Sequence, residues 1–299
     1  MLVKVDGKMP NLAYLKISSY YKARGDQVGF DVSNPDIAYL SCVFSKNAHQ
    51  TIGRAAMLKA QYPDIEVKMG GPGFGIPTSL PDEIEHRMPD YSLYPEIDYS
   101  LGFTTRGCIR NCPFCIVPQI EGSFRENAQI SEFHNPEFDK LVLWDNNLLA
   151  SKKLYEKLDY IKNRNLKVSF NQGLDARLVT EKMASELAEV KSYNLHFTKP
   201  FYYFSWDLIE DEENVLRGLR RMIDAGVPAR CLMVYVLVGF NSTHEQDYYR
   251  FQKLRELGAD SFIMKYNNRR DDKWLNRFAR WVNKRIYKSC ELSEYNSGG

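Results

Sequence analysis

Short apolar runs alternate with helical patterns along most of the chain. In the first part, apolar residues recur at helical spacing between Asn11 and Arg24, and Gly25 follows where such a helix would end. A second helix is predicted from about His49 to Tyr62. Because strands and helices alternate, we expect a parallel sheet. The strands predicted here are the opening MLVKVDG, the segment QVGFD at 27–31, Asp36–Phe44 and Ile65–Met69.

The alternation continues for longer after residue 98. Gly226 and Gly258 stand where C-terminal helix caps belong. Six strands with helices between them predict a partial (βα)6 barrel of the TIM type, since eight units would need a longer chain. An open Rossmann-like sheet is the alternative for the same pattern. The predicted strands are Ser100–Thr104, Lys140–Leu143, Lys167–Asn171, Phe201–Ser205, Cys231–Val238 and Ser261–Lys265, and the predicted helices are Lys152–Asn163, Thr180–Val190, Glu212–Ala225 and Thr243–Leu257.

The fold class expected from this pattern is α/β, in three parts. Residues 1–90 form a small Rossmann-like domain, 91–266 form the barrel, and 267–299 form a basic amphipathic C-terminal helix and tail. The stretch Ile76–Glu96, rich in Pro and acidic residues, is interpreted as the linker between the first two parts. In the third part, basic residues alternate with Trp274, Phe278, Trp281 and Tyr287. Such a segment can bind nucleic acid, but we favour a helix that buries its aromatic stripe.

Composition is ordinary for a globular protein. The chain has 299 residues, of which 44% are hydrophobic and 26% charged, and its formal net charge of +2 does not indicate a polyanionic partner. No apolar run reaches the roughly 18 residues of a membrane span, and the N-terminus carries no signal-like apolar stretch. We therefore expect a cytoplasmic protein that does not enter a membrane.

Three of the six cysteines fall within eight residues, and this changes the picture. Cys108, Cys112 and Cys115 have the spacing C-x3-C-x2-C and follow a predicted strand directly. Clustered thiols in a cytosolic chain indicate metal or redox chemistry. Each of three thiolates can bind one iron of a cubane cluster, which leaves a fourth iron open to a small molecule.

A zinc site is the alternative for the same thiols. Structural zinc normally has four protein ligands, and the nearest further candidates, His134, His196 and Cys231, are not at a close ligand spacing. The pattern of a two-cluster ferredoxin is absent. The sequence therefore favours an iron–sulfur cluster on the three cysteines, which would be its metal ligands and catalytic residues.

With Phe114 as the aromatic residue, C-x3-C-x-aromatic-C resembles the signature of the radical SAM superfamily. The resemblance implies a [4Fe–4S] cluster whose open iron chelates S-adenosylmethionine. One electron, supplied by a cellular donor, then cleaves the cofactor to methionine and a 5′-deoxyadenosyl radical, which abstracts hydrogen from a substrate that the sequence does not identify. The resemblance also places Phe114 near the adenine.

The resemblance covers most of the chain and implies further contacts to S-adenosylmethionine. Asp145 and Asn146, in LVLWDNN, correspond to the contacts with its amino group. The segment FNQGLDAR carries groups for the ribose and carboxylate, and VYVLVGF corresponds to the strand that stacks on the adenine. Ordinary strand-end turns and strand packing are the alternative for these segments. The predicted cofactor residues of the last two segments are Gln172, Asp175, Arg177, Val238 and Gly239.

Three other charged residues are candidates for roles in the site. Arg106 and Arg125 are expected to tune the cluster or to bind a carboxylate. Asp207 follows the fourth predicted barrel strand. It is expected to line the substrate cavity or to cap the next helix, and the cap is favoured.

Residues 1–90 resemble a shortened form of the cobalamin-binding domain that precedes the barrel in some radical SAM enzymes. The motif Asp-x-His-x-x-Gly is absent, because His49 and Gly53 do not reproduce it. Cobalamin is therefore possible but not favoured as a third cofactor. Two alternative functions stay open: a cobalamin-dependent radical SAM methyltransferase, and a non-enzymatic metalloprotein that binds nucleic acid through the basic tail.

Overall fold

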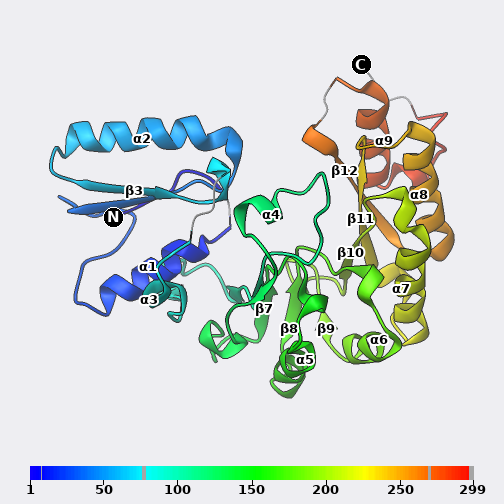
Figure 1. The fold of residues 1–299 in the computed structure, drawn as a ribbon, viewed down its shortest axis with the longest axis horizontal. Helices are drawn as coiled ribbons and strands as arrows, with labels where there is room; N and C mark the ends of the chain where they lie inside the picture. Colours follow the sequence, from blue (N-terminus) through cyan, green and yellow to red (C-terminus); the bar gives the residue numbers. More distant parts are fainter. Residues whose placement is uncertain (8, 76–78, 269–270, 296–299) are drawn as a thin grey trace. The chain divides into compact units, whose positions relative to one another are not determined.

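The computed structural model describes residues 1–7, 9–75, 79–268 and 271–295. It divides into two compact units, Met1–Leu141 and Val142–Gly299, and each is described here by itself. Both units combine helices with parallel strands, which confirms the predicted α/β class (Figure 1).

The first unit begins with a three-stranded parallel sheet in the order β1-β2-β3. Helices α1 and α2 lie on opposite faces of this sheet (Figure 1). Two apolar clusters result, one around Leu2, Tyr14 and Ile17 and the other around Leu40 and Ile65. The predicted strands and helices are confirmed as β1 (Leu2–Val3), α1 (Leu12–Lys22), β2 (Ile37–Ser41), α2 (Ala48–Gln61) and β3 (Glu66–Gly70).

The strand predicted at 27–31 is wrong. The segment is irregular and does not pair as a strand; the Leu2 amide of β1 donates one hydrogen bond to the Gly29 carbonyl, at 2.8 Å. Val28 and Phe30 instead pack against the cluster on the α1 side. The apolar residues of this segment are therefore explained by core packing and not by strand pairing.

The interpretation of 76–96 as a linker is also wrong for residues 79–96. Residues 76–78 lie outside the described residues. The segment contains α3 (Asp82–Glu85) and a 3-10 turn at Tyr91–Leu93, and it packs on α1. Its acidic residues pair with α1 lysines, as Lys16–Glu85 at 2.9 Å shows. The charges that suggested a solvated linker therefore hold the segment in place.

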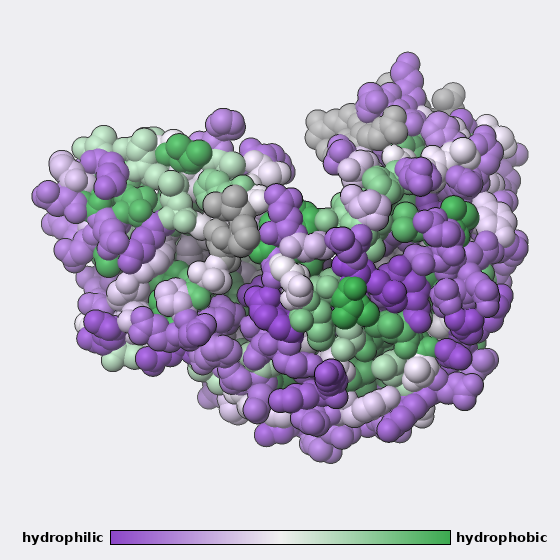
Figure 2. All heavy atoms as spheres, viewed as in Figure 1, coloured by the Kyte–Doolittle hydropathy of each residue, from purple (hydrophilic) through white to green (hydrophobic). Residues whose placement is uncertain are grey.

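Helix α2 exposes an apolar stripe on the side that does not contact the sheet. Ile52, Gly53, Ala56, Met57 and Ala60 are all exposed, and Met57 is 72% exposed. Hydrophobic colouring is visible along this helix at the upper left of Figure 2.

The second unit contains two groups of strands. In one group, β8 and β9 follow β7, which begins in the last residues of the first unit, and in the other, β10, β11 and β12 form a parallel sheet. A single parallel bridge between Leu174 and Phe204 joins the segment after β8 to β10. The α/β class is confirmed here too, and the partial barrel stays a prediction. The elements are β7 (Lys140–Leu143), α5 (Leu154–Asn163), β8 (Lys167–Phe170), α6 (Glu181–Ala188), β9 (Lys191–Ser192), β10 (Tyr202–Ser205), α7 (Glu212–Asp224), β11 (Leu232–Val238), α8 (His244–Leu257), β12 (Asp260–Lys265) and α9 (Lys273–Asn283).

Local chemistry explains where these helices begin and end. The Thr180 hydroxyl accepts the Met183 amide at the start of α6, and Thr243 forms a capping box with Gln246 at the start of α8. Gly258 ends α8 in the left-handed conformation, at φ 82°. The predicted ends at this glycine and at Gly226 are thus confirmed.

Helix α9 packs on β12 and buries the apolar stripe that the sequence predicted. Phe278 and Trp281 are fully buried, and Trp274 stacks on His244 with ring centroids 4.2 Å apart. The Asn283 side chain accepts the Ile263 amide of β12 at 2.7 Å and donates to the Ile263 carbonyl at 3.0 Å. This confirms the favoured interpretation of the segment as an amphipathic helix. The predicted basic residues Arg269 and Arg270 lie outside the described residues.

Among the described residues, none of the helices combines the length and apolar character that crossing a bilayer requires.

Candidate functional site

The cysteine segment is a loop held between two short strands that the sequence did not predict. β5 (Thr105–Arg106) pairs antiparallel with β6 (Arg125–Glu126), and Cys108 forms a further bridge with Ser123. The short helix α4 (Val117–Ile120) follows Cys115. The loop is therefore tied at both ends.

Gly107 fixes the backbone just before the first cysteine. Its φ is +68°, and a Cβ atom there would lie 2.4 Å from the Ser123 carbonyl oxygen. Its amide donates to the Glu121 carboxylate at 2.8 Å. Only glycine allows both this conformation and this approach, so Gly107 and Glu121 together set the position of Cys108.

We expect Gly107→Ala to lower both stability and iron loading. The alanine methyl would meet backbone atoms, which cannot move aside as a side chain can. Gly122→Ala is the matched control, because Gly122 also has positive φ (+75°) but nothing lies within 4 Å of its Cβ position. The control should lower the free energy of unfolding only by the conformational strain of alanine at positive φ, about 1–2 kcal/mol. Urea unfolding and iron analysis after reconstitution measure the difference, and equal losses in both variants would contradict the role of the contact with Ser123.

The three thiols have the chemistry of a cluster ligand set. All three side chains are half-buried, no disulfide joins them, and the Arg110 amide lies 3.3 Å from the Cys108 sulfur. Among the described residues, no group of three or more His, Cys, Asp or Glu side chains is arranged to hold a metal ion. The fit to a cluster therefore rests on the donor chemistry and on the anchored loop, in which each sulfur would bind a different iron.

Arg106 is held beside the loop by the protein's own carboxylates. Its guanidinium lies 3.2 Å from Glu121 and 3.5 Å from Glu85, and it stacks on the Phe103 ring at 3.5 Å from the centroid. Burial raises the pKa of Glu85, but Lys16 and Arg106 outweigh it and hold the pKa below its ordinary value. Of the two carboxylates that Arg106 binds, Glu121 also braces the loop, and Glu85 also pairs with Lys16 of α1.

Arg125 is exposed, and its guanidinium donates to the Glu121 carbonyl at 2.7 Å. It therefore supports the end of α4. A role for either arginine in tuning a cluster stays a prediction.

In the second unit, two of the predicted cofactor residues bind each other. Arg177 donates to both carboxylate oxygens of Asp175, at 2.7 and 3.1 Å, and to Asp211 at 2.6 Å. Burial lowers the pKa of Arg177, but the two carboxylates outweigh it and raise the pKa above its ordinary value. Asn147, which the sequence did not single out, donates to Asp175 at 3.3 Å. The segments after β7 and β8 are thereby joined by a polar network.

The other predicted cofactor residues of this unit lie at or just beyond the carboxyl ends of strands. Asp145 is buried and Asn146 half-buried after β7, while Gln172 is exposed after β8. Val238 is fully buried at the end of β11, and Gly239 follows with φ +75°. The structure thus places them where ligand groups gather in α/β folds, and their contacts with a cofactor stay predictions.

A fully buried ion pair joins the ends of β10 and β11. Arg250 and Asp247, both on α8, are 0% exposed and 2.6 Å apart. The Arg250 guanidinium also donates to the carbonyls of Trp206, Asp207 and Leu237, at 2.7–2.9 Å. Asp247 in turn accepts the Gly239 amide at 3.1 Å. This pair was not predicted from the sequence, because both residues resemble the ordinary charged positions of a surface helix.

Asp207 does not cap the next helix, so the favoured prediction for it is wrong. The N-cap position of α7 is Asp211, and Leu208 precedes the 3-10 turn before it. Burial raises the pKa of Asp207 to about 6, although Arg250 and Arg177 act in the opposite direction. Ser205 and the Leu237 backbone also act to lower this pKa, and burial outweighs them as well.

Because the pKa of Asp207 is raised on folding, folding stability should fall as pH rises from about 4 to 6, where the folded protein binds the extra proton. Asp207→Asn should flatten this part of the pH profile by up to about 3 kcal/mol. Urea unfolding at pH 4.5 and 7 measures it. The exposed Asp224→Asn is the control and should keep the wild-type slope; an unchanged slope in Asp207→Asn would contradict the assignment.

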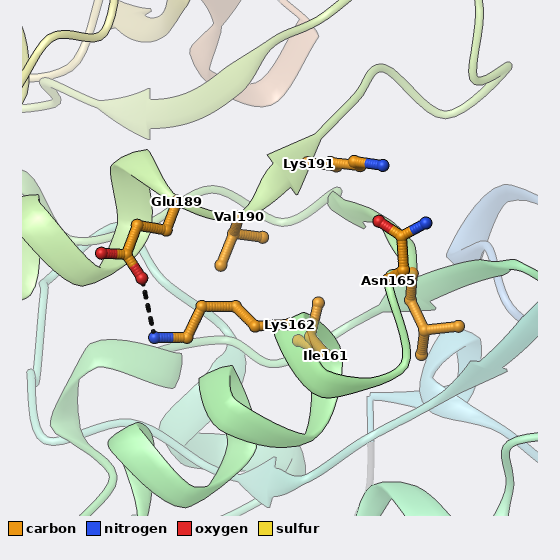
Figure 3. Close-up of a pocket in the computed structure, with 7 residues that line it drawn as sticks. Ile161, Lys162, Asn165, Glu189, Val190 and Lys191 are labelled. Carbon is orange, nitrogen blue, oxygen red and sulfur yellow. Dashed lines mark hydrogen bonds and ion pairs between the residues drawn. The ribbon is translucent and has the colours of Figure 1, made fainter.

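A hollow of about 210 Å³ lies at the other end of the strands (Figure 3). It is lined by the end of α5 and by residues that directly precede or begin β8 and β9. Lys162 in its wall is paired with Asp159, Glu186 and Glu189. The amino ends of parallel strands carry stabilising contacts in such folds, so we assign this hollow a structural role. Its lining residues are Ile161, Lys162, Asn165, Leu166, Glu189, Val190 and Lys191.

Neither a comparison with protein-family models nor a search of curated proteins finds a match to this chain.

Proposed function

We propose that the protein is a radical SAM enzyme. The observation that carries the proposal is the loop of Cys108, Cys112 and Cys115, held by Gly107 and Glu121 at a strand end. Three thiols with this spacing, and with no fourth ligand nearby in the sequence, suit a cluster with one open iron better than a closed zinc site.

Cys108, Cys112 and Cys115 would hold the [4Fe–4S] cluster, which supplies the electron that cleaves S-adenosylmethionine to a 5′-deoxyadenosyl radical. The Arg110 amide donates to the Cys108 sulfur at 3.3 Å and so helps to orient it. Glu121 keeps the loop in register with β5 and β6.

Residues after β7 and β8 would contribute further contacts to S-adenosylmethionine. Asn146 and Gln172 follow β7 and β8, and their amides can both donate and accept hydrogen bonds. Asp175 and Arg177 act as a pair that orients the segment after β8, because their charges are already matched. We place the enzyme in the cytoplasm, which is a reducing compartment. A cellular one-electron donor would reduce the cluster.

The test is anaerobic reconstitution of the full chain with iron and sulfide, followed by reduction with dithionite in the presence of S-adenosylmethionine. We expect about four irons per chain and 5′-deoxyadenosine as a product. A protein that binds one zinc and no iron, or a cluster-loaded protein that makes no 5′-deoxyadenosine, would overturn the proposal. Absorbance spectra after incubation with cobalamin test the alternative of a cobalamin-dependent methyltransferase, which predicts that the protein binds cobalamin.

A further inference from the structure

The sheet of the first unit ends in an open edge. Among the described residues, β3 pairs with β2 and with no second strand. The Glu66 amide donates to the Asp36 carbonyl at 2.8 Å, so the backbone groups of Glu66 face β2. Alternate residues of a strand direct their backbone groups to opposite sides. The amides and carbonyls of Val67 and Met69 therefore point out of the sheet, where another strand can pair with them.

The side chains of β3 divide between the two faces of the sheet. Val67 packs in the cluster that contains Ala55 of α2. Because side chains alternate along a strand, Glu66 and Lys68 point to the face away from α2. Their side chains are 57% and 42% exposed and lie 3.3 Å apart. Met69, on the side of α2, is 47% exposed. The edge thus carries one negative charge, one positive charge and an open apolar group.

Part of the apolar stripe of α2 faces the same edge. Helix α2 contacts both β2 and β3 and runs alongside β3 (Figure 1). The Arg54 guanidinium donates to the Lys4 carbonyl, just beyond β1, at 2.7 Å, so this flank of the helix faces β1. Ile52 and Ala56 each lie about 160° around the helix from Arg54. They are exposed and occupy the flank toward the open edge, and Ile52 is 50% exposed.

A second copy of the chain suits this edge in one register. A strand that pairs with its own copy across a two-fold axis runs antiparallel to it. Pairing centred on Lys68 would set two lysines opposite each other, and pairing centred on Met69 would leave Glu66 and Lys68 without opposite charges. Pairing centred on Val67 sets Glu66 of each copy opposite Lys68 of the other. Opposite charges stabilise such pairs and like charges destabilise them, so the charges select this register.

The same pairing would cover the exposed flank of α2. Since α2 contacts β2 and β3, it lies over the space between them, about one strand spacing of 4.8 Å from the two-fold axis. The axes of the two α2 helices would then lie about 10 Å apart, which is the distance at which helices pack. Ile52 and Ala56 of each copy would meet the same flank of the other helix.

We propose that two copies of this chain form a symmetric dimer through β3 and α2. The two β3 strands pair antiparallel with Val67 on the two-fold axis, and the two α2 helices pack side by side over the joined sheet. The dimer is independent of the proposed function, because none of its interface residues belongs to the cysteine loop.

The test of the strand register is a charge exchange, measured by sedimentation velocity on the full chain. The wild type should form dimers between about 1 and 100 μM. Lys68→Glu and Glu66→Lys should each raise the dissociation constant at least about tenfold, because both cross-strand pairs become like-charged. The double variant Glu66→Lys/Lys68→Glu restores opposite charges and should dimerise within about threefold of the wild type.

A chain that stays monomeric over this range would overturn the proposal. So would single variants that dimerise like the wild type, or a double variant that dimerises no better than the single ones.

A second pair of variants tests the helix contact. Ala56→Lys leaves an exposed helix position occupied by a good helix former, but it sets two lysines against each other in the dimer, and it should weaken dimerisation about tenfold. Gln50→Lys is the matched control, because Gln50 is exposed one turn before Arg54 on the flank toward β1. The control should dimerise like the wild type. Equal effects of the two substitutions would remove α2 from the interface and overturn the proposal.

Discussion

Replacing Cys112 with alanine is expected to abolish formation of 5′-deoxyadenosine, to below about 1% of the wild-type amount. Cys112 is the middle ligand of the proposed triad, and two thiolates cannot hold a cubane cluster with one open iron. Iron content after anaerobic reconstitution should fall together with the product. The measurement is product by chromatography and iron by colorimetric analysis on the same sample.

Cys290→Ala is the matched control. Cys290 is half-buried like the triad but lies beyond α9. The Trp281 indole donates to its backbone carbonyl, a hydrogen bond that alanine keeps. The control should keep full iron loading and activity. If Cys112→Ala binds as much iron as Cys290→Ala and remains active, the triad is not the cluster site.

Replacing Arg250 with methionine is expected to destabilise the protein by about 3–5 kcal/mol. The substitution leaves Asp247 buried with no opposite charge, and it also removes the donors to three backbone carbonyls. Urea unfolding followed by tryptophan fluorescence measures the loss, because all four tryptophans lie in the second unit. Adding Asp247→Asn to Arg250→Met should recover part of it, because the uncompensated charge is then gone.

Arg255→Met, five residues further along α8, is the control for this experiment. Arg255 is about half-exposed, and its ion pair with Glu291 is 3.5 Å long. Exposed pairs contribute at most about 1 kcal/mol. A loss in Arg250→Met no larger than in Arg255→Met would mean that the buried pair does not brace the ends of β10 and β11.

The sequence predicted the regular elements well, because burial imposes a period that can be read directly. The helices ending at Gly226 and Gly258 and the strand Lys140–Leu143 were predicted to within a few residues. The predictions were wrong where apolar or charged residues make tertiary contacts but do not recur at the spacing of a helix or a strand. Phe30 packs in a core without pairing as a strand, and Glu85 binds Lys16 although its segment has the composition of a linker.

For the candidate site, the sequence could indicate the thiols but not what holds them. The spacing of Cys108, Cys112 and Cys115 is local and visible in the chain. The anchor from Glu121 to Gly107 depends on the fold of β5 and β6, two strands of two residues each that are too short to show a pattern. The pair Asp175–Arg177 likewise has its partner Asp211 34 residues away.

Asn283 satisfies both backbone groups of Ile263 on β12, as a neighbouring strand would. The amide side chain acts as a stop at the margin of the sheet, where an exposed backbone would otherwise recruit another chain. We therefore expect α9, which carries Asn283, to prevent the protein from associating with itself through the edge of this sheet. A chain truncated before Lys273 should lose the two hydrogen bonds from Asn283 and form oligomers through β12.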